Sequence, residues 1–173
     1  MTGVQTCALP ISLPDRNNLE ILDQIIDRES ICIHFRTKQR WRGDSVANPD
    51  TIEFHGICSL KYYNTAIEMI KKKVENPHFF VFSDCIEWVR ENFKSDLPTT
   101  FVDYNYVEER EFEDLRLMMH CKHYIIANST FSWWAAWLNP KQEKIVIAPK
   151  RWFADEKMNS QTQDLIPEDW IRI

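Results

Sequence analysis

Apolar positions along the chain follow two alternating patterns, one typical of short strands and one typical of helices. Strands are predicted at residues 31–33, 79–82, 100–102, 124–127 and 145–148. Between and before them, apolar residues recur three or four positions apart, which predicts helices at 17–28, 60–74, 86–93, 112–119 and 131–138. Ser59, directly before the second helix, is a suitable N-cap.

Four of the five predicted strands are apolar on successive residues rather than on every second residue. This pattern is typical of parallel strands that are covered by helices on both faces. Together with the strand–helix alternation, it predicts an α/β fold, a Rossmann-like, doubly wound parallel sheet. Such domains bind ligands beyond the carboxyl ends of their strands, so candidate site residues are sought there.

The composition narrows the ligand class. The 173 residues are 44% hydrophobic and 27% charged, which suits one domain with its own core. A net charge of -5 argues against a general nucleic-acid binder, and no apolar run approaches the roughly 20 residues of a membrane span. With only three glycines, neither a G-x-G-x-x-G motif nor a P-loop can be built, so any bound phosphate is held by side chains and helix N-termini.

The five cysteines lack metal-binding spacing. None forms a C-x-x-C pair, and we expect no metal ion or other cofactor. Cys32 and Cys121 adjoin apolar runs, where a buried small side chain is expected. The set favours a reducing compartment, and we expect the protein in the cytoplasm, free or at the inner face of the membrane.

Residues 1–12, MTGVQTCALPIS, match no signal peptide, because a basic start and a continuous apolar stretch are both missing. We interpret them as the translation of a sequencing-library adapter, which places the protein's own start further upstream. The alternative is a natural disordered leader. On the first interpretation the domain comprises residues 13–173.

Polar groups suited to an anion follow the first predicted strand. His34 and Arg36 come directly after it, and Arg42 and Asp44 follow a few residues later. Arginine matches phosphate oxygens with paired N–H donors, and histidine can hydrogen-bond a base or a ribose. A solvated surface loop is the alternative for the arginines.

Two further strand ends carry polar residues. Asp84 follows the second strand, where it either contacts a ribose or guanine edge or caps the next helix. Asn128, Ser129 and Ser132 follow the fourth strand and open a helix, whose free N–H groups form a natural anion site. Ordinary capping is the alternative. Core packing is favoured for the nearby tryptophans, Trp133, Trp134 and Trp137.

Several motifs in order resemble glycosyltransferase family 11, the α-1,2-fucosyltransferases. They are HFR…RGD, FHGICSLKYY, HFFVFSDCIEWVREN, EDLRLMMHCKHYIIANSTFSWWAAWLN and IVIAPKRWF, and the similarity runs from residue 31 to 173. The resemblance implies the donor-binding, carboxy-terminal half of a GT-B-like, metal-independent, inverting enzyme. Its partners would be GDP-fucose, as donor, and a glycan whose terminal galactose accepts L-fucose on the 2-hydroxyl.

The resemblance also implies roles for individual residues. The family's H-x-R-R-G-D motif maps onto His34, Arg36, Arg42 and Asp44, with Arg36 and His34 as the catalytic pair and Arg36 stabilising the GDP leaving group. The other implied donor contacts are Asp84, Asp114, Asn128, Ser129 and Ser132.

The chain departs from the family pattern in three places. Residues 37–41 separate the two arginines, which are adjacent in the family motif, and Cys85 stands where relatives often carry a second aspartate. No G-L-G-N-Q-type segment of the amino-terminal half is present. Two alternatives to the fucosyltransferase reaction therefore stay open, a donor-binding fragment without activity and a related enzyme that uses another sugar nucleotide.

Overall fold

The computed structural model describes residues 14–37, 53–105 and 110–173. The segment interpreted as adapter-derived lies outside these ranges, as do Arg42, Asp44 and most of the 37–41 insertion.

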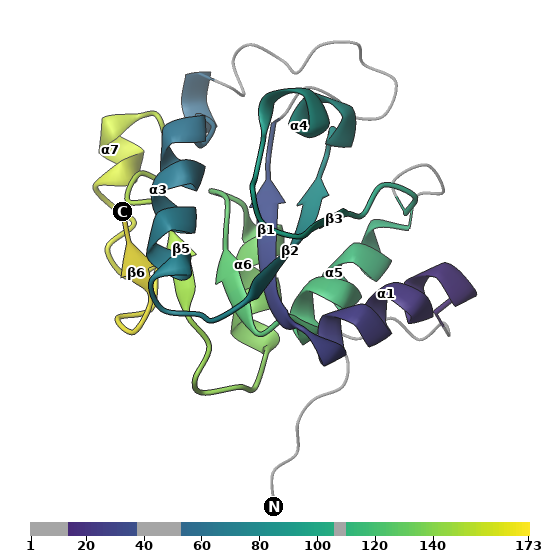
Figure 1. The fold of residues 1–173 in the computed structure, drawn as a ribbon. Helices are drawn as coiled ribbons and strands as arrows, with labels where there is room; N and C mark the ends of the chain where they lie inside the picture. The colour runs from purple at the N-terminus through teal and green to yellow at the C-terminus, as the bar shows by residue number, and fades with distance from the viewer. Residues whose placement is uncertain (1–13, 38–52, 106–109) are drawn as a thin grey trace, which may run out of the picture.

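Six parallel strands form one sheet in the described part of the chain (Figure 1). Their order is β3-β2-β1-β4-β5-β6, so successive strands are added first on one side of β1 and then on the other. This order confirms the predicted Rossmann-like, doubly wound sheet, and its switch point lies between β1 and β4. The strands are β1 (Glu29–Phe35), β2 (Pro77–Ser83), β3 (Thr99–Phe101), β4 (His123–Ile125), β5 (Val146–Ala148) and β6 (Ile171–Arg172).

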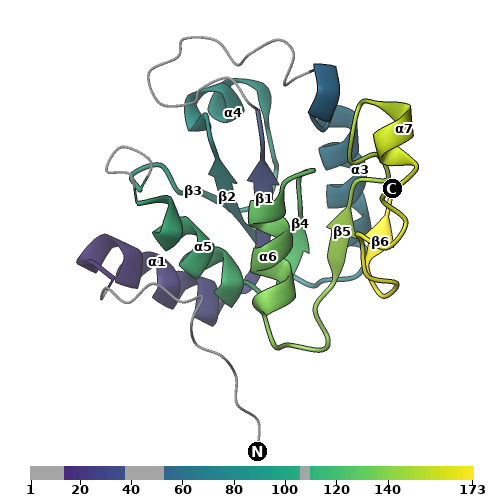
Figure 2. The same cartoon turned by 180° about the vertical axis from the view of Figure 1, so that it is seen from behind.

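Helices cover both faces of the sheet (Figures 1 and 2). One face packs against α1 (Arg16–Asp27), α5 (Glu111–His120) and α6 (Thr130–Leu138). The other face packs against α3 (Leu60–Lys71) and α4 (Ile86–Asn92), and the short α7 (Glu156–Asn159) lies near the carboxyl end. No described helix is both long and apolar enough to cross a membrane.

The two helical layers explain why the strands are apolar on successive residues. In β2, Phe80 and Phe82 belong to the core under α1, α5 and α6, whereas Phe79 and Val81 belong to the core under α3 and α4. Consecutive side chains of a strand point to opposite faces, so a strand with two buried faces has no polar side to show. Cys32 and Cys121 are fully buried, as predicted.

Most predicted elements are present, with shifted ends. The Ser59 N-cap is confirmed, because its hydroxyl accepts a hydrogen bond from the Tyr62 N–H at 3.3 Å. The helix that follows ends at Lys71 rather than at Val74. Asn76, with φ of 52°, turns the chain into β2, and this left-handed backbone is incompatible with a continuing helix. Helix α7 and strand β6 were not predicted.

Candidate functional site

The predicted site residues that the structure describes come mainly from the carboxyl ends of β1, β2 and β4. Strands β1 and β2 are paired so that Phe35 lies opposite Ser83, which places the segments after both strands next to each other. Strand β4 flanks β1 on its other side. Three of the polar segments chosen from the sequence therefore converge on one edge of the sheet, around the switch point.

His34, which follows the predicted strand but lies inside β1 in the structure, is buried, with 5% of its surface exposed. It pairs in register with Phe82, and its ring lies 5.8 Å from that of Phe131, at the start of α6. The Nδ1 atom is buried and has no hydrogen-bond partner among the described residues. A buried polar atom without a partner costs free energy, which marks this nitrogen as a candidate ligand contact.

The charge state of His34 follows from its burial. Burial lowers its pKa to about 4, an effect that the Asp84 carboxylate opposes and the Arg36 guanidinium reinforces. The imidazole is therefore neutral at pH 7, with one ring nitrogen as donor and the other as acceptor. A neutral ring of this kind suits hydrogen bonding to a base or a ribose better than ion pairing with a phosphate.

Arg36 and Thr37 are held by Asp84. The Arg36 Nη1 atom lies 3.3 Å from Asp84 Oδ2. The Thr37 backbone N–H and hydroxyl both donate to Asp84 Oδ1, at 2.7 and 2.9 Å. Asp84 does not cap α4, because the N-cap of that helix is Cys85, which makes no side-chain cap hydrogen bond.

A second side chain fixes the same segment from the opposite face of the sheet. Tyr63, on α3, donates its hydroxyl to the His34 carbonyl at 3.0 Å. Its ring stacks on that of Phe35, with the ring centres 3.9 Å apart. Tyr63 lies within the helix predicted at 60–74, and nothing in the spacing of that segment indicates the contact to His34.

The amino end of α6 lies where an anion site was predicted, and anion binding there stays a prediction. Its N-cap, Ser129, makes no side-chain cap hydrogen bond, and its carbonyl accepts from the Trp133 N–H at 3.1 Å. The N–H groups of residues 130–132 precede the first helical hydrogen bond and point outward with the positive end of the helix dipole. Ser132 is buried, and its hydroxyl donates back to the Ser129 carbonyl at 3.3 Å, so it stabilises the first turn.

Asn128 braces the carboxyl edge of the sheet. Its amide donates to the carbonyls of His55, Gly56 and Trp152, at 2.9, 3.3 and 3.0 Å. Its carbonyl oxygen lies 3.5 Å from the Cys58 thiol, which donates to it. These contacts tie β4 to the segments before α3 and after β5, and the predicted donor contact of Asn128 stays a prediction.

Asp114 lies in the first turn of α5, on the same side of the sheet as α6. Its carboxylate accepts from Asn105 Nδ2 at 2.7 Å, and Asn105 in turn exchanges two hydrogen bonds of 2.9 Å with Asn18 on α1. Burial raises the pKa of Asp114 to about 7, Asn105 lowers it, and Glu111 and Glu113 add to the increase. No hydrogen bond or ion pair among the described residues joins Asp114 to His34 or Arg36.

The comparison with known proteins assigns the family. Residues 15–173 match the sequence profile of Glycosyl transferase family 11. The chain belongs to this family. The family resemblance found from the sequence is therefore confirmed, and the α/β sheet is that of a glycosyltransferase.

Two bacterial relatives match nearly the whole of this family 11 chain. An alpha-1,2-colitosyltransferase of Escherichia coli is 41% identical over 155 residues, which are 89% of this chain and 51% of the relative. The O-antigen biosynthesis glycosyltransferase WbnK of Escherichia coli is 36% identical over 159 residues, 91% of this chain and 49% of the relative. The chain thus spans about half the length of these two relatives.

A mammalian relative matches a shorter stretch of the family 11 chain. It is the galactoside alpha-(1,2)-fucosyltransferase 2 of Rattus norvegicus, which is 29% identical over 97 residues, 56% of this chain and 27% of the relative.

The tryptophans of α6 depart from the sequence prediction. Trp133 is partly buried and donates its indole N–H to the Leu165 carbonyl at 2.8 Å, as core packing requires. Trp134 and Trp137 are 48% and 52% exposed, so the prediction of core positions is wrong for these two. They pack mainly on Trp133, whose ring stacks on that of Trp137 with the centres 5.2 Å apart.

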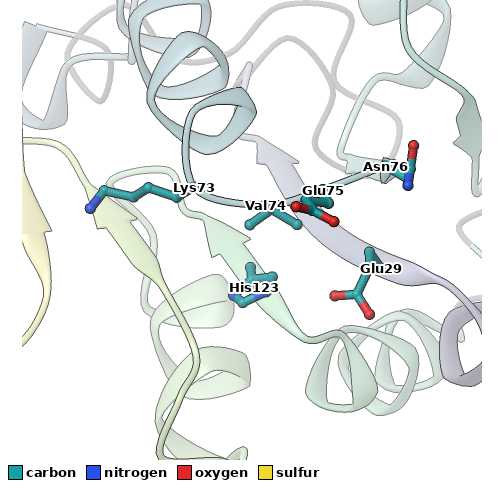
Figure 3. A pocket seen from close by; sticks show the side chains of 6 residues that line it. All are labelled: Glu29, Lys73, Val74, Glu75, Asn76 and His123. Atoms are coloured by element: carbon teal, nitrogen blue, oxygen red, sulfur yellow. The ribbon is translucent and has the colours of Figure 1, made fainter.

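A hollow of about 370 Å³ lies at the opposite edge of the sheet, where the strands begin (Figure 3). None of the predicted site residues lines it. His123, on its wall, already accepts a hydrogen bond at Nδ1 from the Ile145 N–H, and Glu29 pairs with Lys122. The lining residues are Glu29, Lys73, Val74, Glu75, Asn76 and His123. In the described part of the chain no cluster of three acidic, histidine or cysteine side chains could hold a metal ion.

Proposed function

We propose that this family 11 chain is the donor-binding part of a galactoside α-1,2-fucosyltransferase. The enzyme transfers L-fucose from GDP-fucose to the 2-hydroxyl of a terminal galactose, with inversion and without a metal ion. The observation that carries the proposal is the convergence of three features at the switch point of the sheet: Arg36, the buried Nδ1 of His34, which has no hydrogen-bond partner among the described residues, and the amino end of α6.

The arrangement supplies what a diphosphate leaving group needs. As the glycosidic bond breaks, negative charge develops on the phosphate next to the sugar. In this proposal the Arg36 guanidinium and the N–H groups at the start of α6, next to Ser129, stabilise this charge. Since an arginine and a helix amino end supply the positive charge, the proposed mechanism needs no metal ion.

The nucleoside is proposed to lie on the face of the sheet that carries α5 and α6. The neutral ring of His34 offers a hydrogen bond to the ribose or the base. Guanine presents two neighbouring N–H donors on one edge, and one carboxylate accepts hydrogen bonds from both. Asp114 is a buried carboxylate on α5, and its pKa of about 7 indicates that its hydrogen bonding does not fully offset the cost of burying its charge. Pairing with guanine would supply the donors that this carboxylate lacks.

A second donor is supported by one relative. The relative that is 41% identical is named as an alpha-1,2-colitosyltransferase, and colitose is L-fucose without its 3-hydroxyl. The same guanosine diphosphate site would serve both sugars, so GDP-colitose is the alternative donor. The sugar end of the pocket decides between them.

Donor binding and sugar transfer are separate properties of this polypeptide. The chain spans about half the length of its two bacterial relatives, so a further candidate function is donor binding without transfer. Measuring binding and transfer on the same preparation separates this candidate from the fucosyltransferase reaction.

Titration calorimetry with a panel of sugar nucleotides tests the proposal. We expect GDP-fucose or GDP-colitose to bind at least about tenfold more tightly than UDP-galactose, a difference of about 1.4 kcal/mol. Equal binding of UDP-galactose would contradict the assignment of guanine as the base. Tightest binding of GDP-mannose would contradict the assignment of fucose or colitose as the donor sugar. A transfer assay with a β-galactoside acceptor then distinguishes an enzyme from a donor-binding fragment.

A further inference from the structure

We propose that Asp84 is a positioning residue, which fixes the Arg36 guanidinium and Thr37 for the donor diphosphate without contacting the nucleotide itself. This inference rests on the proposed function and deepens it. It assigns a role that differs from the ribose or guanine contact predicted from the sequence.

Both oxygens of the Asp84 carboxylate contact the residues that follow β1. Asp84 Oδ1 accepts two hydrogen bonds from Thr37, and Asp84 Oδ2 pairs with Arg36. The Asp84 side chain is 7% exposed, so these contacts replace most of its hydration. A direct contact to ribose or guanine would have to displace one of them at a cost, because a buried carboxylate that loses a partner is poorly solvated.

The register of β1 and β2 brings Asp84 next to the end of β1. Phe35 and Ser83 lie opposite each other at the ends of β1 and β2, so Asp84 is the next residue on the neighbouring strand. From there its carboxylate can reach the backbone of Thr37 as well as the side chain of Arg36. A guanidinium carries five N–H donors, so an ion pair through Nη1 is compatible with a phosphate contact by the same group.

Residues 34–37 are held by contacts from two different parts of the fold. Tyr63 donates to the His34 carbonyl from α3, while Asp84 holds Arg36 and Thr37 from the end of β2. Residues 34–37 thus have defined positions before any ligand arrives. Preorganised groups stabilise developing charge more effectively than groups that must reorient.

The test compares GDP with guanosine in the 173-residue chain, for wild type, Asp84→Asn, Arg36→Ala and the double variant. Asp84→Asn keeps the shape and the acceptor for Thr37 but removes the charge beside Arg36. We expect about tenfold weaker GDP binding, the size of one lost charge-assisted contact, and unchanged guanosine binding. In the Arg36→Ala background Asp84→Asn should add little, because both changes act through one group.

Asp96→Asn is the matched control. Asp96 forms an exposed ion pair with Lys71 before β3, and its loss should leave GDP affinity within about twofold of wild type, as for surface ion pairs generally. If Asp84→Asn proves unstable in thermal melts, Thr37→Val removes one of the same hydrogen bonds and should weaken GDP binding several-fold.

Three outcomes overturn the inference. Equal losses for GDP and guanosine in Asp84→Asn would indicate direct nucleoside contact, full additivity with Arg36→Ala would indicate independent action, and unchanged GDP affinity would remove any role. The last result would leave the proposed function standing. A wild-type chain that binds neither GDP nor guanosine would instead overturn the proposed function and, with it, this inference.

Discussion

At the scale of single residues, the site is defined by His34, which is polar, almost fully buried and without a partner for Nδ1 among the described residues. A protein of this size keeps few such atoms, since most buried polar groups find a hydrogen bond. The unliganded protein bears the free-energy cost of leaving this buried nitrogen unpaired. A nucleotide that hydrogen-bonds to Nδ1 would remove that cost. This is the physical reason to place the ligand at His34.

The low pKa of His34 predicts a pH dependence of stability. Between pH 6.5 and about 4 the unfolded chain binds a proton at His34 that the folded chain does not, so this residue makes folding less favourable as the pH falls through that window. At pH 4 this difference in proton binding lowers the free energy of unfolding by on the order of 3 kcal/mol. His34→Gln should flatten the urea-derived stability curve between pH 4 and 6.5. A variant curve parallel to that of wild type would contradict the buried, neutral state.

The hydrogen bonds of Asn128 predict that its substitution lowers the stability of the fold, besides any effect on donor binding. Asn128→Ala leaves the carbonyls of His55, Gly56 and Trp152, in two segments, without their shared donor, and we expect a decrease in the free energy of unfolding of about 2–3 kcal/mol. The matched control is Asn92→Ala, because the exposed Asn92 amide donates only to the Trp88 carbonyl of its own helix. Its loss should be within about 0.5 kcal/mol. Equal losses in chemical denaturation would refute the bracing role.

At the scale of elements, α5 carries a carboxylate that burial disfavours. The pKa of Asp114 is about 7 in the folded chain and 3.8 as its ordinary value, so the folded chain keeps a proton that the unfolded chain releases between these limits. Stability contributed by this residue therefore falls as the pH rises from 4 to 7.

Asp114→Asn should remove that decline, because an amide keeps an acceptor for Asn105 and carries no charge. We expect the variant to be more stable than wild type at pH 8 by more than about 1 kcal/mol, with the difference shrinking toward pH 4. Thermal melts at both pH values measure it, with the exposed Asp96→Asn as control. A variant less stable than wild type at pH 8 would show that the folded protein stabilises the negative charge of Asp114 and would contradict this prediction.

The elements also show what could be predicted from the sequence and what could not. The apolar runs at 79–82 and 124–127 predicted buried parallel strands, because a strand with two covered faces must be apolar on both. Strand β6 has two residues and exists through its pairing with β5, which no local pattern encodes.

Within the site, the sequence predicted location better than role. Strand ends identified His34, Arg36 and Asp84 as neighbours, because the carboxyl ends of parallel strands share one edge. The partners of Asp84 and Asn128 depend on contacts between segments 24 to 73 residues apart, and the Tyr63–His34 contact joins two elements whose spacing carries no such signal.

The exposure of Trp134 and Trp137 was also not predictable from the local sequence. Aromatic composition suggested core positions, but both side chains are about half exposed, with the Trp137 ring stacked on Trp133 and the Trp134 ring meeting Trp133 edge-on. Which face of a short, largely apolar helix is buried depends on its neighbours in space, which the local sequence does not specify.

At the scale of the molecule, a family 11 glycosyltransferase domain presents its candidate groups at the switch point of a doubly wound sheet. The central claim is that Arg36 binds the donor diphosphate there. Titration of GDP into wild type, Arg36→Ala and Arg16→Ala measures this claim directly. Arg16 is the matched control, because its ion pair with Glu20 is exposed on α1.

We predict that Arg36→Ala weakens GDP binding by about a hundredfold or more, since a charge-assisted contact to phosphate is lost, and that Arg16→Ala binds as wild type does. Circular dichroism and thermal melts must show both variants folded. Wild-type GDP affinity in a folded Arg36→Ala variant would contradict the account.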